Sequence, residues 1–378
     1  MQSRIKYILL LLLVNLSCTE QFRLDTDFES SFLIVDGRIT NEEGPYEVRL
    51  FRSKKSGDHY SIKPKAVAEE GAIISIYDDK GNSDSFIESS PGIYHNMTSS
   101  FRGIIGRSYW IEIQTSDGKK YESRPEVIPP EILIEKIYGE ETKLIQNDGK
   151  YLKGAGLFID AKSPSNQSHY MRWEYQESWE WHTPHVFPKT SNPAIICYPH
   201  ETSSNISIFD GSKQSKKEFK HLSTRFISEN QVKLNYEYLL NVSLYSISSE
   251  NYQFWENMQN SSQESGKLHD VIPSNPRGNI SSCNDTDLVT GYFEASSVNT
   301  KNQIFSIDDF DIDFTDYDKD CEEFELVMKM EAGSPNEDVY HIISSSSDGG
   351  DNIVYVVKWN YCYDCNVEYS PKKPSFWP

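Results

Sequence analysis

The chain has 378 residues and a formal net charge of −20, with 57 acidic side chains against 37 Lys and Arg. Such an acidic chain repels phosphate backbones, so the composition argues against nucleic-acid binding. Aromatic residues are plentiful, with 23 Tyr, 18 Phe and 7 Trp, which favours a core built on β-sheets over one built on Leu-rich helices.

The first eighteen residues have the features of an export signal. Arg4 and Lys6 precede the apolar run 7–14, which is too short to cross a bilayer. Cys18 follows a small residue at the end of this segment, as in bacterial lipoprotein signals, although Asn15 stands where Leu is usual. We predict cleavage before Cys18 and acylation of its thiol and amino group. The alternative is an ordinary signal peptide with an incidental cysteine.

Residues 1–17 are thus the predicted signal peptide, and the polar residues 18–30 the tether of a lipid-anchored protein. Two or more fatty chains hold a protein on a membrane almost permanently. Removal of the signal leaves 361 residues with a formal charge of −22, because the signal carries two basic residues and no acid. That length suggests two domains.

Residues 31–126 are predicted to form an immunoglobulin-like or transthyretin-like β-sandwich. Short alternating strands are separated by turn signals at intervals of roughly eight to twelve residues. The clearest hairpin is 109–123, which turns at Ser116-Asp117-Gly118. Three prolines at 125, 129 and 130 end the domain, because proline cannot donate to a sheet ladder.

Residues 127–378 are predicted to form a larger β-rich domain with one or two short helices, so the fold class is mainly β. Strands are expected at 131–138, 156–160, 236–247 and 353–359, where apolar residues alternate or run together.

One helix is predicted after residue 247. Ser248 or Ser249 can cap it, and Tyr252, Trp255 and Met258 recur at helical spacing.

The most aromatic strand is predicted at 170–181. Its alternation places Met171, Trp173, Tyr175, Trp179 and Trp181 on one face, opposite a charged face. Core packing is the expected role of these rings.

A ligand platform is the alternative for Trp179 and Trp181, because exposed aromatic faces stack on sugars and planar molecules. His182 and His185 lie beside them as candidate ligand-binding residues. Pro184 prevents a regular helix that would aim both imidazoles at one metal ion, so no metal site is predicted here.

Five cysteines remain after Cys18, enough for two disulfides and one free thiol in an exported protein. The pairing is left open by the sequence. For Cys362 and Cys365, structural disulfides are favoured over a zinc half-site or a redox pair, with Cys197 as one possible mate. The candidates are Cys197, Cys283, Cys321, Cys362 and Cys365.

Seven aspartates lie between Asp308 and Asp320. A calcium loop is the alternative to a strand with acids in water, but Phe314 stands where an EF-hand needs Gly. We therefore predict a strand in which Phe310, Ile312 and Phe314 point inward.

No nucleophile elbow, phosphate loop, dinucleotide fingerprint or zinc-protease helix occurs in the chain. Catalytic residues and cofactors are therefore not predicted.

Several short motifs occur in an order that resembles the domain-of-unknown-function family 4249 of Bacteroidota-type outer-membrane lipoproteins. The motifs are structural, cover nearly the whole mature chain, and carry weight only in this order. They are Cys18, Phe32–Thr40, Gly92-Ile93-Tyr94, Tyr109–Ser123, Gly278-Asn279-Ile280, Gly291–Ser296, Cys362-Tyr363-Asp364-Cys365 and Lys373–Trp377.

The resemblance implies a lipid-anchored outer-membrane protein that accompanies a TonB-dependent β-barrel transporter, and it supplies no catalytic residue. The expected location is the outer membrane, facing the cell surface or the periplasm. We therefore expect a noncatalytic accessory or substrate-binding protein with a small-molecule or glycan ligand. The alternatives are an exported hydrolase acting on glycans or peptides, and a surface adhesion or structural protein.

Overall fold

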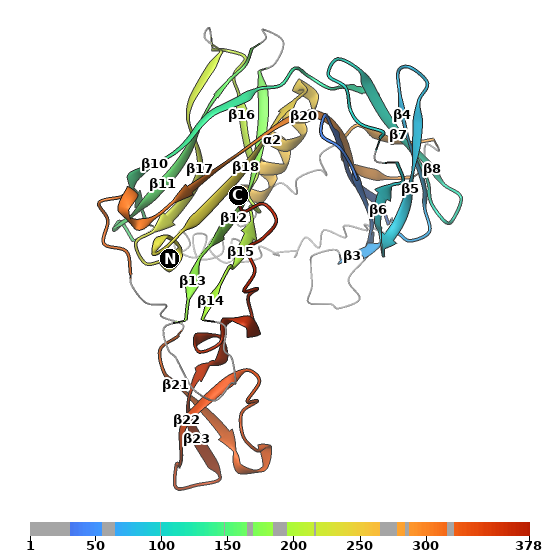
Figure 1. The fold of residues 1–378 in the computed structure, drawn as a ribbon. Coiled ribbons are helices and arrows are strands. Elements are labelled where there is room, and N and C mark those ends of the chain that lie inside the picture. The colour runs from blue at the N-terminus through green and yellow to red at the C-terminus, as the bar shows by residue number, and fades with distance from the viewer. Residues whose placement is uncertain are drawn as a thin grey trace, which may run out of the picture.

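A computed structural model describes ten stretches of the chain (Figure 1). They are residues 31–54, 65–98, 100–146, 148–164, 169–183, 195–214, 217–264, 278–283, 287–315 and 321–378. The predicted signal peptide and tether, including Cys18, lie outside these residues.

The fold is mainly β, as predicted, and its largest sheet has fifteen strands within the described residues. The main path of this sheet runs through twelve of them. In order across the sheet they are β15 (His200–Thr202), β12 (Tyr170–Trp179), β18 (Tyr238–Ile247), β20 (Val289–Phe305), β1 (Leu33–Thr40), β2 (Glu47–Lys54), β6 (Ile93–Asn96), β5 (Ser83–Ser90), β4 (Ile73–Asp78), β7 (Ser108–Gln114), β8 (Lys120–Ser123) and β19 (Ile280–Ser282).

Three short strands join this path from the side. β16 (Ser207–Asp210) pairs with β12, β3 (Lys65–Ala68) pairs with β2, and β9 (Glu126–Val127) pairs with β7. The remaining strands form three smaller sheets. These are β10 (Leu133–Ile145) with β11 (Tyr151–Lys162) and β17 (Glu218–Ser228), β13 (Trp181–His182) with β14 (Ile196–Cys197), and β21 (Phe324–Lys329) with β22 (Tyr340–Ser347) and β23 (Asn352–Trp359).

Strand β20 joins the two halves of the molecule. Its first half pairs in parallel with β1, and its second half pairs antiparallel with β18. Gly291 of β20 has a φ of +110°, and a Cβ there would lie 1.8 Å from the carbonyl oxygen of Val35. Only glycine permits this approach of β20 to β1.

The core of the N-terminal half therefore includes residues from late in the chain. Leu33 and Val35 of β1 pack with Phe293 of β20 and Ile280 of β19 in one buried cluster. The predicted boundary at residue 126 thus does not mark the end of this unit, since β19 and β20 complete it. Local alternation could not reveal this, because the parallel pairing of β1 with β20 spans more than 250 residues of chain.

A second core lies between the β10–β11–β17 sheet and strands β12 and β18 (Figure 1). The aromatic face of β12 fills it, with Trp173 5% exposed, and this confirms the predicted packing role of that face. Arg172 and Glu174 alternate with these rings and lie on the other side of the strand.

The predicted helix is α2 (Ser249–Glu264). The hydroxyl of Ser248 accepts a hydrogen bond from the Asn251 backbone N–H, so Ser248 is the cap. The described 3-10 helices are η1 (Val232–Leu234), η2 (Ile307–Asp309), η4 (Met330–Ala332), η5 (Asn360–Cys362) and η6 (Cys365–Val367).

The aspartate-rich segment does not form the predicted strand in its described part. Residues 307–309 are the 3-10 helix η2, and residues 310–315 are irregular. The side-chain alternation is nevertheless as expected, with Phe314 buried while Asp311 and Asp313 are exposed. Residues 316–320 lie outside the described part.

Candidate functional site

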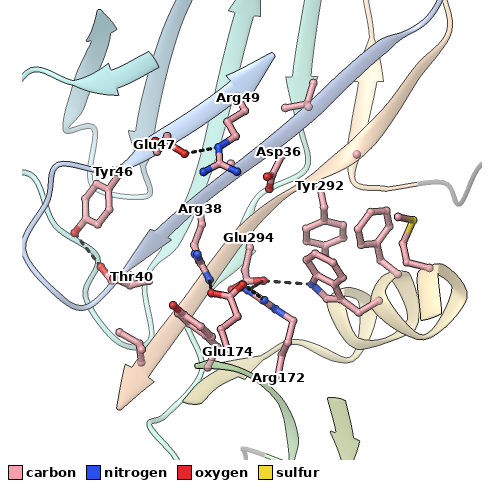
Figure 2. Close-up of a pocket in the computed structure, with 18 of the residues that line it drawn as sticks. Asp36, Arg38, Thr40, Tyr46, Glu47, Arg49, Arg172, Glu174, Tyr292 and Glu294 are labelled. Atoms are coloured by element: carbon pink, nitrogen blue, oxygen red, sulfur yellow. Dashed lines mark hydrogen bonds and ion pairs between the residues drawn. The ribbon is translucent and has the colours of Figure 1, made fainter. Parts of the chain in front are cut away.

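A hollow of about 850 Å³ opens on the face of β1, β2 and β20 that points away from the N-terminal core (Figure 2). Helix α2 and the start of β12 close its other side. We call this space the β20 hollow. Its walls are made by Phe32, Ile34–Arg38, Thr40, Glu42, Glu43, Pro45–Glu47, Arg49, Arg172, Glu174, Thr202, Ser203, Tyr245, Phe254, Trp255, Met258, Thr290–Tyr292, Glu294 and Val298.

The strand register explains why charged residues meet here. Leu33, Val35 and Ile39 of β1 are buried in the core, so the alternate residues Asp36 and Arg38 face the hollow. Asp36 lies between Arg49 of β2 and Tyr292 of β20 in the paired register.

Arg38 lies next to Glu294 in the same parallel pairing. The face of the sheet that lines the hollow therefore carries acidic, basic and tyrosine side chains next to one another.

Two arginines and two glutamates form an ion-pair network at the floor of the hollow. Arg172 lies 2.5 Å from Glu174 and 3.3 Å from Glu294, while Arg38 lies 3.5 Å from Glu174. Burial alone would raise the pKa of Glu294, but Arg172 and Arg38 lower it to about 2. Glu294 is therefore ionised at neutral pH, and the network remains charged.

Aromatic rings hold the two guanidinium groups in place. Arg38 lies over the ring of Tyr245 at 4.2 Å, and Arg172 lies over Trp255 of α2 at 4.6 Å. The indole N–H of Trp255 also donates to Glu294 over 3.4 Å. Helix α2 is thus bonded to the floor of the hollow through Trp255.

Asp36 differs from the other carboxylates of the floor. Within the described part of the chain its side chain makes no hydrogen bond and no ion pair within 4 Å, although Arg38 and Arg49 lie on either side of it. Its surface is exposed where it opens into the hollow, and protein atoms enclose it on the other sides. This enclosure raises the pKa of the Asp36 carboxyl, against the lowering effect of Arg38, Arg49 and Arg172.

Glu126 lies behind the wall of the hollow and is only 7% exposed. It accepts hydrogen bonds from the hydroxyls of Ser248 and Tyr292, the latter over 3.1 Å. Burial raises the pKa of Glu126 to about 8, with a further increase from the charge of Glu294. A neutral carboxyl group at Glu126 therefore connects β9, the cap of α2 and β20.

A second buried network lies in the other core, on β12, β17 and η1. The carboxylate of Glu177 is 2.9 Å from Arg225 and 2.7 Å from Lys233, and it accepts from the hydroxyl of Tyr238. Lys233 also pairs with Glu201 at 2.7 Å.

Burial would raise the pKa of Glu177, but Lys233 and Arg225 lower it to about 2. The two acidic and two basic side chains of this network carry equal and opposite charge and pair with one another. We therefore assign the network a structural role.

The structure does not support a ligand platform at the tryptophans predicted from the sequence. Trp179 is 7% and Trp181 5% exposed, and both belong to the core cluster. His182 stacks on Tyr236 at 3.6 Å and lies 2.6 Å from Glu180. His185 lies outside the described residues.

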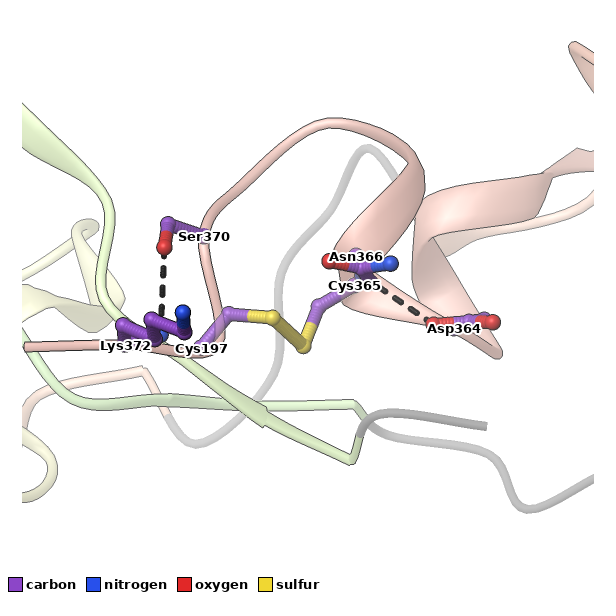
Figure 3. The surroundings of a disulfide bond; sticks show 6 residues. All are labelled: Cys197, Asp364, Cys365, Asn366, Ser370 and Lys372. Atoms are coloured by element: carbon purple, nitrogen blue, oxygen red, sulfur yellow. Dashed lines mark hydrogen bonds between the residues drawn. A yellow bond between two sulfur atoms is a disulfide. The ribbon is translucent and has the colours of Figure 1, made fainter. Parts of the chain in front are cut away.

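Two disulfides connect the C-terminal segment to itself and to the body of the protein. Cys197 of β14 bonds to Cys365 (Figure 3), and Cys321 bonds to Cys362. The two cysteines of the Cys-x-x-Cys motif thus have different partners. The predicted structural role, with Cys197 as one mate, is confirmed. Cys283 is free and exposed.

Metal-binding groups of three or more His, Cys, Asp or Glu side chains do not occur among the described residues. The same part of the chain also contains no helix with the length and hydropathy needed to cross a bilayer.

Sequence reasoning missed the hollow because its walls come from distant segments. Asp36, Arg172 and Glu294 are separated by more than 100 residues each. Two local signals did exist, namely the charged alternate positions of β1 and the charged face predicted opposite the β12 rings. Neither signal says that the two faces meet.

The fold defines the chain as a mainly β protein whose largest sheet contributes to both cores and carries a polar cavity on the outer face of β1, β2 and β20. The chain belongs to the family described as Domain of unknown function (DUF4249), whose sequence profile matches residues 19–302, about three quarters of the length. The predicted family resemblance is thereby confirmed. No curated protein matches the chain. The disulfide-linked segment 321–378 lies beyond the matched residues.

Proposed function

We propose that this chain is a noncatalytic binding protein, held on the outer membrane by an acylated Cys18, which assists a TonB-dependent transporter. The β20 hollow is the observation that carries the proposal. Its volume of about 850 Å³ lies within the range of small-molecule sites, and polar groups converge on one side of it. The Asp36 carboxylate opens into that space and makes no ion pair within 4 Å among the described residues.

The leader and the cysteine that follows it support attachment to a membrane. Metabolic labelling with radioactive palmitate in the native host tests this step. We expect label in the wild-type chain and none in Cys18→Ser, which should move to the soluble fraction. Cys283→Ser is the matched control, because it removes an exposed free thiol of the mature chain. Equal labelling of Cys18→Ser and wild type would contradict the anchor.

Association with a transporter is tested by mild detergent extraction of the native outer membrane. After chemical crosslinking, purification through a C-terminal tag should recover a large β-barrel protein in near-stoichiometric amount. Recovery of the chain alone under the same conditions would contradict the transporter part of the proposal. Ligand binding in the hollow is a separate matter and does not depend on this result.

An exported hydrolase and an adhesion protein are the alternatives from the sequence. No observation on the described residues favours either of them over binding in the hollow.

A further inference from the structure

The charges of the β20 hollow do not balance. Its walls carry six carboxylates and three guanidinium groups, which gives a formal charge of −3. The carboxylates are those of Asp36, Glu42, Glu43, Glu47, Glu174 and Glu294, and the guanidinium groups are those of Arg38, Arg49 and Arg172. A cavity with this excess attracts cations, and its low-dielectric walls strengthen the attraction.

Each arginine of the hollow already has a carboxylate partner. Arg49 lies 2.5 Å from Glu47, and Arg38 and Arg172 both pair with Glu174. These pairings leave Asp36 without a counter-ion within 4 Å in the described residues, in the middle of the floor (Figure 2). An anionic ligand would have to displace an existing partner of an arginine, whereas a cationic ligand needs only to approach Asp36.

Apolar surface for the rest of such a ligand lies beside Asp36. Ile34 lies two positions before Asp36 on the same face of β1, and Phe32 lies two positions before Ile34. Both side chains line the hollow and are partly exposed. Tyr292 and Phe254 are only 6% and 8% exposed, so Ile34 and Phe32 offer the apolar surface that a ligand can contact.

From these observations we infer that the β20 hollow binds an organic cation, a primary amine attached to an aromatic or apolar body, with Asp36 as its counter-ion. The ammonium group donates hydrogen bonds to the Asp36 carboxylate. The apolar body of the ligand packs on Phe32 and Ile34. This inference rests on the proposed binding function and specifies the ligand class for the same site.

Three probes that share one ring and differ in charge test the inference. They are tyramine, N-acetyltyramine and 3-(4-hydroxyphenyl)propionate, measured by saturation-transfer NMR against the full mature chain. We expect tyramine to bind the most tightly of the three. In Asp36→Asn its affinity should fall roughly tenfold or more, because a hydrogen bond to a charged group is lost.

Glu122→Gln is the matched control, because it makes the same charge change on an exposed residue of β8 outside the hollow. Its tyramine affinity should equal that of the wild type. Tighter binding of the propionate, or binding of all three probes unaffected by Asp36→Asn, would overturn the cation assignment and leave the binding function intact. Absence of binding by every probe at millimolar concentration would count against both.

Discussion

The two buried ion networks of this protein use the same residue types in different ways. Around Glu177, two acids and two bases balance, and a tyrosine hydroxyl completes the contacts. Around Glu294, the carboxylates are also paired with arginines, but Asp36 lies beside them with no ion pair within 4 Å in the described residues.

The first network lies inside a core and the second forms the floor of a cavity. A carboxylate without an ion pair at the wall of a cavity is open to a ligand, whereas a buried carboxylate whose ion pairs are complete is not.

The largest expected effect on stability belongs to the network around Glu177. Glu177→Ala leaves Lys233 and Arg225 without their central partner in a buried site, which should cost about 3 to 5 kcal/mol of the free energy of unfolding. Urea denaturation followed by tryptophan fluorescence measures this. Glu201→Ala is the control, since Glu201 is 55% exposed at its side chain and should cost less than about 1 kcal/mol. Equal effects of the two substitutions would show that burial does not distinguish them.

The second prediction concerns how the network around Glu294 affects stability at low pH. The pKa of Glu294 is about 2 in the folded state and near 4.5 in the unfolded state, so the unfolded state binds more protons between these values. Its stabilising contribution is therefore present above pH 4.5 and is lost as the pH falls toward 2.

Between pH 5 and pH 2, the wild type should lose about 3 kcal/mol more than Glu294→Gln in the free energy of unfolding. Parallel pH profiles of the two proteins would contradict the assigned charge of Glu294.

The third prediction uses Glu126, whose pKa shift has the opposite sign. Its pKa is about 8 in the folded state, so the folded state binds more protons than the unfolded state between pH 4.5 and 8. Stability should therefore fall as the pH rises through this window.

From pH 6 to pH 9 the wild type should lose about 2 to 3 kcal/mol relative to Glu126→Gln, whose amide resembles the neutral acid. Thermal melts across this range measure the difference. A wild-type profile that follows that of the variant would show that Glu126 is ionised at neutral pH.

The smallest effect on stability is expected at Asp36. Enclosure disfavours its ionised form in the folded state, so Asp36→Asn should leave the free energy of unfolding within about 0.5 kcal/mol of the wild type or raise it slightly. Urea denaturation at pH 7 checks this. A loss as large as that of Glu177→Ala would mean that Asp36 is a structural member of the network, and the difference between the two regions would disappear.

Local patterns predicted much of the fold. The alternation in β1, β4 and β7 and the cap of α2 at Ser248 were sufficient for these elements, because each depends on neighbours in sequence. Strand β17 was missed, since His221 has a φ of +58° and the pairing with β11 shifts register there, between Leu222 and Phe219, and again at Thr224, between Arg225 and Ser223. Such bulges break the period of two on which a strand prediction depends.

The hollow could not be predicted because it results from long-range pairing. Arg38 and Glu294 meet only when β20 pairs with β1, and Arg172 reaches them only when β12 lies two strands away from β20 in the same sheet. Charge counting along the chain cannot identify Asp36 as unmatched. That property depends on which carboxylates already hold the three arginines in the folded protein.

The most direct test of the central claim is the pKa of the Asp36 carboxyl, measured by carbon-13 NMR with and without saturating tyramine. In the free protein we predict a pKa above the ordinary aspartate value, and in the complex a lower one, because a bound ammonium group stabilises the carboxylate. An ordinary pKa that tyramine leaves unchanged would show that Asp36 is neither unmatched nor a counter-ion for a ligand.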